Sequence, residues 1–150
     1  MTSGAPTVAV ESELSPEFNR FVLGTGDTLQ IADQLHPQAG AATALGAVAP
    51  EGILFTLSPG VVEVDIRVEV WDEEPPSFTR EYLDTFTSEI TPTQNPLQLT
   101  SISPGPSDRS LDLPEIRRYK VEAYVLSRET RRDEDFDLDV RAEQWVIRLW

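Results

Sequence analysis

The clearest pattern in this chain is an alternation of apolar and polar residues between Val62 and Trp71. The apolar positions are Val62, Val64, Ile66, Val68 and Val70, and the polar positions between them are Glu63, Asp65, Arg67 and Glu69. Because successive side chains of a β-strand point to opposite faces, this period of two predicts a half-buried strand. Its apolar face must be covered, so the rest of the chain has to supply a second layer.

Shorter apolar runs predict the remaining strands. They cover Glu17–Leu23, Ile53–Leu57, Tyr82–Thr91, Leu97–Ile102, Tyr119–Leu126 and Glu143–Trp150, with a short edge segment at Leu111–Pro114. Turns rich in Pro and Gly separate these runs, and no long amphipathic helix pattern occurs. This spacing is typical of an antiparallel β-sandwich of about seven or eight strands with little helix, and it predicts an all-β fold.

The segments between the strands suggest how the chain is divided. Residues 1–15 are small, polar and Pro-containing, which predicts a loosely held tail before a single β-sandwich domain at 16–150. The Ala- and Gly-rich segment 32–50 and the charged segment 127–141 are expected to be loops. Ser58-Pro59-Gly60 has Pro and Gly in the order of a type II turn, so a hairpin should join Ile53–Leu57 to the alternating strand.

The charge balance narrows the range of partners. The chain has 26 Asp and Glu residues against 12 Lys and Arg residues, which gives a net charge of −14. Such a protein does not bind nucleic acid through phosphate neutralisation, and an anionic membrane repels it. A basic protein is therefore the expected partner, because opposite charge speeds association.

Other features of the composition bear on location and chemistry. There is no cysteine, so disulfides and thiolate sites are excluded. The first residues do not have a secretory signal pattern, and no run approaches the roughly 18 apolar residues of a membrane span. We expect a soluble, cytoplasmic protein, and the sequence leaves its oligomeric state open.

One group of carboxylates is a candidate partner-binding patch. It lies on the polar face of the alternating strand and directly after it, and its members are Glu63, Asp65, Glu69, Asp72, Glu73 and Glu74. Such residues commonly keep a strand soluble and its edge unpaired. The alternative is a recognition surface, on which carboxylates imitate nucleic-acid phosphates and steer a basic protein into place.

Aromatic residues form a second candidate surface. Trp145 shares its phase with Ile147 and Leu149, which predicts a core position. Trp71 and Trp150 fall in the opposite phase and are expected to be exposed. Together with Tyr124 they are the aromatic contacts that a carbohydrate or another small ligand would use.

No motif indicates an enzyme or a cofactor. His36 is the only histidine, so two-histidine metal sites and redundant triads are absent. Asp135, Asp137 and Asp139 have the spacing that opens an EF-hand calcium loop, but Val140 stands where Gly is required and Val146 where a bidentate Glu is required. A different calcium site at these carboxylates and a solvated acidic strand both remain open.

The order of features also resembles a known family. Ile53–Phe55, the Asp-Glu-Glu-Pro that follows the valine-rich strand and Leu111–Pro114 before a Tyr-led strand are similar to the small bacterial inhibitors of the competence DNA-entry nuclease. The ending Trp-Val-Ile-Arg-Leu-Trp resembles uncharacterised actinobacterial proteins of the same layout. The resemblance implies a β-sandwich that binds a nuclease or toxin and acts by occlusion.

The sequence therefore predicts a non-enzymatic acidic protein-binding domain of inhibitor or immunity type. The alternative is a carbohydrate- or small-ligand-binding module, assisted by calcium. Apart from this calcium, neither hypothesis involves a bound cofactor.

Overall fold

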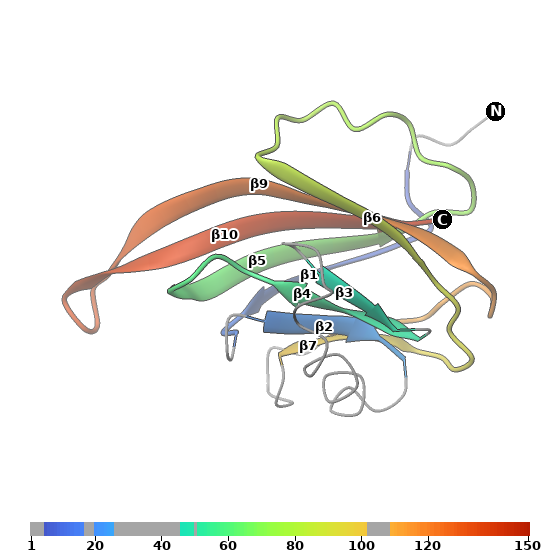
Figure 1. Cartoon of the computed structure of the whole chain (residues 1–150), viewed down its shortest axis with the longest axis horizontal. Coiled ribbons are helices and arrows are strands. Elements are labelled where there is room, and N and C mark those ends of the chain that lie inside the picture. The colour runs from blue at the N-terminus through green and yellow to red at the C-terminus, as the bar shows by residue number, and fades with distance from the viewer. Residues whose placement is uncertain (1–4, 17–19, 26–45, 50, 102–108) are drawn as a thin grey trace.

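The computed structural model describes residues 5–16, 20–25, 46–49, 51–101 and 109–150 (Figure 1). These residues form ten β-strands in two five-stranded sheets, with no helix. Sheet A has the order β1-β5-β10-β9-β6 and consists of β1 Val8–Leu14, β5 Val61–Val70, β10 Leu138–Leu149, β9 Tyr119–Asp133 and β6 Asp84–Ile90. Sheet B has the order β3-β4-β2-β7-β8 and consists of β3 Gly46–Ala49, β4 Gly52–Thr56, β2 Arg20–Gly24, β7 Leu97–Ser101 and β8 Arg109–Leu111. The all-β prediction is confirmed, with more strands than expected.

The alternating strand is β5, and its phase is as predicted over most of its length. Val64, Ile66, Val68 and Val70 are at most 2% exposed. Val62 is 46% exposed, so its predicted place on the core face is wrong. The cause is a bulge: Arg141 of β10 is opposite Val61, and the next residue of β10 is opposite Glu63, so Val62 is the extra residue.

Sheet A is mixed, which corrects the prediction of a purely antiparallel fold. β5 pairs in antiparallel fashion with β1 but in parallel with β10, and the other pairs are antiparallel. Parallel neighbours need a long crossover, and here the chain forms β6, β7, β8 and β9 before it returns as β10. A period of two identifies a strand but carries no information about the direction of its neighbour.

The turn at Ser58–Gly60 has the predicted type. Val61 N–H donates to the Ser58 carbonyl at 3.3 Å, and Gly60 has a φ of 81°, as position three of a type II turn requires. The predicted hairpin is wrong, because β4 belongs to sheet B and β5 to sheet A. The turn therefore carries the chain from one sheet to the other.

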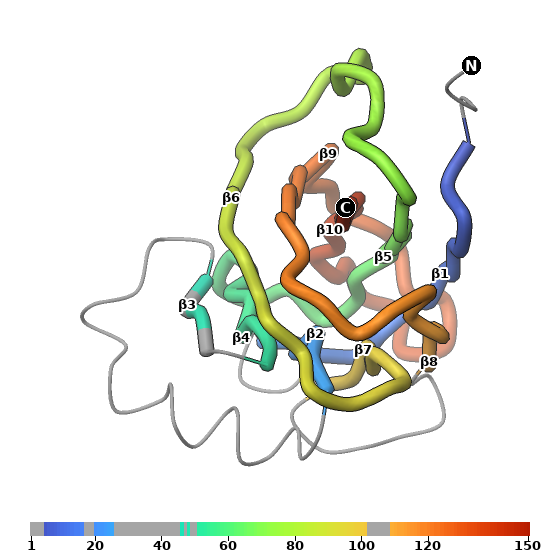
Figure 2. The backbone as a smooth tube through the Cα atoms, turned by 90° about the vertical axis from the view of Figure 1, so that its right-hand side faces the viewer, coloured from blue at the N-terminus to red at the C-terminus, as the bar shows by residue number. Residues whose placement is uncertain are grey.

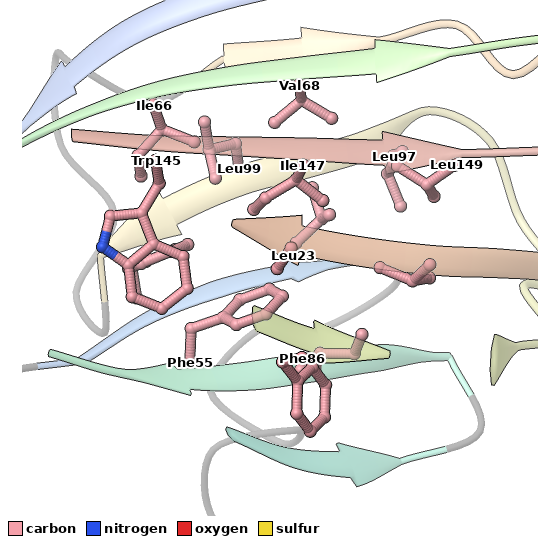
Figure 3. Packing of buried hydrophobic residues seen from close by; sticks show 14 of the residues in the cluster. Leu23, Phe55, Ile66, Val68, Phe86, Leu97, Leu99, Trp145, Ile147 and Leu149 are labelled. Carbon is pink, nitrogen blue, oxygen red and sulfur yellow. The ribbon is translucent and has the colours of Figure 1, made fainter. Parts of the chain in front are cut away.

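One hydrophobic cluster contains side chains from both sheets (Figure 3). Trp145 of sheet A is fully buried, which confirms its predicted core position. Its ring contacts Phe21 and Phe55 of sheet B edge-on, with centroids 5.2 and 5.5 Å away. Phe55 also meets Phe86 of β6 at 6.0 Å. These aromatic contacts join the two sheets.

Two segments expected to lack regular structure form strands. Val8–Leu14 is not a loose tail: it pairs with β5 along its whole length, and Leu14 is 1% exposed. The expected loop at 127–141 is a long hairpin of β9 and β10, which we call the β9–β10 arm (Ser127–Arg141). Figure 1 shows the arm extending past the ends of the other strands.

The expected loop at 32–50 is described only in part. Residues 46–49 of it form β3, an edge strand paired with β4. Residues 32–45 and 50, and with them His36, lie outside the described residues. Within the described ranges, no helix is long and apolar enough to cross a membrane.

Candidate partner-binding surface

Two arginines neutralise part of the predicted carboxylate patch. Arg131 of the β9–β10 arm donates to Asp65 at 2.7 Å and to Glu63 at 3.3 Å. It also donates to Glu129 on its own strand at 2.8 Å. The hydrogen bond to Asp65, followed by the one to Glu129, raises the pKa of the Arg131 guanidinium. These carboxylates therefore present less free charge to a partner than the sequence suggests.

Glu69 is engaged in a similar way. Arg67 donates to it at 2.7 Å, and the indole of Trp71 donates to its other oxygen at 3.0 Å. Arg67 also reaches Glu11 of β1 at 3.0 Å. The hydrogen bond to Glu69 is the largest cause of the raised pKa of Arg67. Glu69 thus serves as an internal acceptor on the outer face of sheet A.

The other three carboxylates of the predicted patch differ from Glu63, Asp65 and Glu69. Asp72, Glu73 and Glu74 follow Trp71, the first residue after β5, and are all exposed. Among the described residues, no hydrogen bond or ion pair engages their carboxylates. The six predicted patch residues therefore divide into three that arginines hold and three that are available to a partner.

The loop between β5 and β6 folds back over the outer face of sheet A. In Figure 2 it forms a wide arc with the C-terminus of the chain inside it. Arg148 of β10 donates to the Pro76 carbonyl at 2.7 Å, and Leu83 N–H donates to the Val125 carbonyl at 2.7 Å. Phe78 stacks on Tyr124 of β9, with centroids 3.9 Å apart and rings 6° from parallel. These contacts attach the loop to β9 and β10.

A hollow of about 480 Å³ lies where this loop meets the sheet, and we call it the loop pocket. Its lining comes from the loop, β9 and the end of the chain, and consists of Glu74, Pro75, Pro76, Ser77, Phe78, Tyr82, Glu122, Tyr124, Arg148 and Trp150. Two of the three predicted aromatic contacts, Tyr124 and Trp150, meet here. The third, Trp71, does not line the loop pocket.

The two tryptophans that were predicted to be exposed are both at least partly buried. Trp71 is 8% exposed, so its predicted exposure is wrong. Trp150 is half-buried, and its backbone pairs with Lys120. Tyr124 is 7% exposed, and burial, followed by the nearby Glu122 carboxylate, raises the pKa of its hydroxyl. Strand phase assigned these residues to the outer face, but it could not indicate that residues 72–83 cover part of that face.

Arg148 also belongs to this site, although the sequence pattern did not predict it. Its side chain is 7% exposed, and it donates to Glu122 at 2.6 Å as well as to Pro76. Its guanidinium carbon lies 5.3 Å from the Phe78 centroid and 5.6 Å from that of Tyr124. The sequence did contain one indication of this role, since Arg148 is the single charged residue in the apolar segment Trp145–Trp150. A charged side chain in a buried strand needs a partner, so Arg148 could have been predicted to bind one.

The candidate calcium ligands lie at the tip of the β9–β10 arm. Arg132 forms ion pairs with Asp137 and, at 3.6 Å, with Asp139. Asp137 has a φ of 52°, in the left-handed region that Asp tolerates in turns. Within the described part of the chain, no three His, Cys, Asp or Glu side chains are grouped so that they could hold a metal. Phe136, between these carboxylates, is 73% exposed.

The fold defines the class of this protein: it is all-β, with one mixed and one antiparallel five-stranded sheet. Within that class it is similar to ComJ from Bacillus subtilis, an inhibitor of the DNA degrading activity of NucA. The TM-score is 0.58 with 18% identity, and 93% of each chain is covered. It is also similar to the crocagin biosynthetic gene J product, with a TM-score of 0.54, 15% identity, and coverage of 96% of this chain and 98% of that one.

At these identities the likeness is one of fold. It confirms at that level the resemblance to the competence nuclease inhibitors seen in the order of sequence features. No protein-family model matches the chain, and a search of curated proteins finds no match.

Proposed function

We propose that this protein is a non-enzymatic inhibitor that binds a nuclease or toxin and blocks it by occlusion. The observation that carries the proposal is the likeness to ComJ over 93% of both chains, since ComJ inhibits a nuclease. Function does not follow from fold alone, so the proposal also depends on the charge and shape of this protein's own surface.

We propose further that the two sheets form a β-sandwich that acts as a rigid support for the binding surface. The aromatic contacts of Trp145 with Phe21 and Phe55 support this arrangement, because they join the sheets through one core. A rigid support limits the ordering cost on binding and so favours affinity.

The charge supports a basic partner. A net charge of −14 attracts a basic protein over long range, and Asp72, Glu73 and Glu74 offer carboxylates that no arginine pairs with in the part of the chain that the structure describes. The carboxylates of Glu63 and Asp65 contribute less, because Arg131 already holds both.

Affinity capture tests the proposal. The immobilised protein is exposed to a lysate of its source organism at low salt, and bound proteins are eluted with salt and identified by mass spectrometry. Each is then assayed for DNA and RNA degradation and for toxicity, with and without this protein. We expect a stoichiometric basic partner whose activity is suppressed. The absence of any stoichiometric partner, or a partner whose activity is unchanged, would overturn the proposal.

A further inference from the structure

We propose that the loop pocket receives an arginine side chain of the partner, so that recognition depends on one guanidinium group held by aromatic rings and carboxylates. This rests on the proposed function for the identity of the partner, but the pocket itself can be tested without it. The volume of about 480 Å³ falls in the range of pockets that hold small ligands.

The aromatic lining suits a flat cation. Phe78 and Trp150 are half-buried, and Tyr82 is 47% exposed, so all three residues retain accessible surface. Aromatic faces attract cations, and a planar guanidinium also stacks on them. The protein already uses this interaction here, since the Arg148 guanidinium carbon lies 5.3 Å from the centroid of Phe78.

The charges of the lining favour a cation over an anion. Arg148 is balanced by Glu122 at 2.6 Å, which leaves Glu74 as the unbalanced charge of the lining. Asp72 and Glu73 precede it directly in the chain and are also exposed. An anionic ligand would be repelled by these carboxylates, whereas a guanidinium can donate two hydrogen bonds in one plane to a carboxylate.

A buried donor points to a peptide as the carrier of this cation. Arg148 lines the loop pocket, and its buried Nε–H has no acceptor among the described residues. Buried donors are normally paired, because an unpaired one loses its hydration without compensation. A peptide brings carbonyl oxygens that can accept this hydrogen once the Arg148 side chain turns its Nε toward the loop pocket, and a free cation does not.

Peptide titration followed by NMR tests the proposal on the intact protein. The probe is acetyl-Gly-Arg-Gly-amide, and the signal is the indole N–H of Trp150, assigned by its loss in Trp150→Phe. The comparison peptides replace Arg with Lys, or with citrulline, which keeps the shape but has no charge. We expect a saturable shift with the Arg peptide, binding weaker by about threefold with Lys, and no shift with citrulline.

Matched variants locate the binding. Glu74→Gln and Tyr82→Ala change exposed side chains of the lining and should each weaken Arg-peptide binding by about threefold. Glu134→Gln and Phe136→Ala make comparable changes at the tip of the β9–β10 arm and should leave it unchanged. The exposed positions of all four residues allow these variants to fold.

The outcomes separate this proposal from the proposed function. Three results would overturn the guanidinium site, whatever partner is captured. The first is the absence of a Trp150 shift with the Arg peptide, and the second is equal binding of the citrulline or Lys peptide. The third is an equal effect of the arm variants and the pocket variants on Arg-peptide binding. A pocket that binds the Arg peptide as expected, in a protein that captures no nuclease or toxin, would support the site and overturn the proposed function.

Discussion

Asp65 of β5 and Arg131 of β9 form an ion pair of 2.7 Å across β10, the strand that lies between them. The pair connects the β9–β10 arm to the body of sheet A. It also neutralises the Asp65 carboxylate, which was predicted from the sequence to bind a partner. Both side chains are about one-third exposed, so the pair contributes little to the free energy of unfolding and acts mainly on the surface charge.

The division of the carboxylate patch leads to a prediction about association rates. Asp72→Asn/Glu73→Gln/Glu74→Gln should slow association with the captured partner by about tenfold at low salt and weaken its salt dependence, because free charges steer encounter. The control is Glu63→Gln/Asp65→Asn, which removes carboxylates that Arg131 holds and should have a smaller effect. Stopped-flow or surface plasmon resonance rates at several salt concentrations measure both. Equal effects of the two variants would contradict the division.

Arg148 should contribute substantially to stability. Arg148→Met removes the guanidinium that donates to the Glu122 carboxylate and to the Pro76 carbonyl, and we expect the free energy of unfolding to fall by about 2–3 kcal/mol. Urea unfolding followed by fluorescence measures this. The double variant Arg148→Met/Glu122→Gln should regain part of the loss, because no carboxylate is then left unpaired. A double variant as unstable as the sum of the two single ones would show that the pair is not coupled.

Glu51 should make the stability depend on acidic pH. It accepts hydrogen bonds from the hydroxyl and the backbone N–H of Thr93, and the hydroxyl hydrogen bond is the largest cause that lowers the pKa of Glu51 below its usual 4.5. A lowered folded-state pKa stabilises the protein above the unfolded-state value, and this stabilisation is lost as the pH falls through the folded-state value.

The measurement is the melting temperature of the wild type and of Glu51→Gln between pH 7 and pH 3. The wild type should be the more stable of the two at pH 7, and the difference should shrink below about pH 4.5. Glu134→Gln, a change at an exposed carboxylate of the arm, is the control for general charge. A difference that grows on acidification would contradict the assignment.

Calcium should have no effect at the arm tip. Arg132 already pairs with Asp137 and Asp139, so a cation would have to displace it. We expect millimolar CaCl₂ to shift the melting temperature by less than about 1 °C, since a ligand that does not bind cannot stabilise. MgCl₂ at equal ionic strength is the control. A calcium-specific rise that disappears in Asp135→Asn/Asp139→Asn would restore the calcium hypothesis.

Features encoded over a few neighbouring residues could be predicted from the sequence. The burial of Val64, Ile66, Val68 and Val70 follows from the period of two, and the type II turn at Ser58–Gly60 follows from the backbone preferences of Pro and Gly. Trp145 was placed in the core by its phase with Ile147 and Leu149. In each case the cause lies within the segment, so local sequence is sufficient.

Features that join distant segments were decided only by the tertiary structure. The same turn could have closed a hairpin, but packing places β4 and β5 in different sheets, and β5 pairs in parallel with β10. The partners of Asp65 and of Pro76 stand 66 and 72 residues away from them, in Arg131 and Arg148. The strand order therefore decides which carboxylates stay free and which aromatic rings are covered. The sequence of a single strand does not show which other strand it pairs with, so this order could not be predicted.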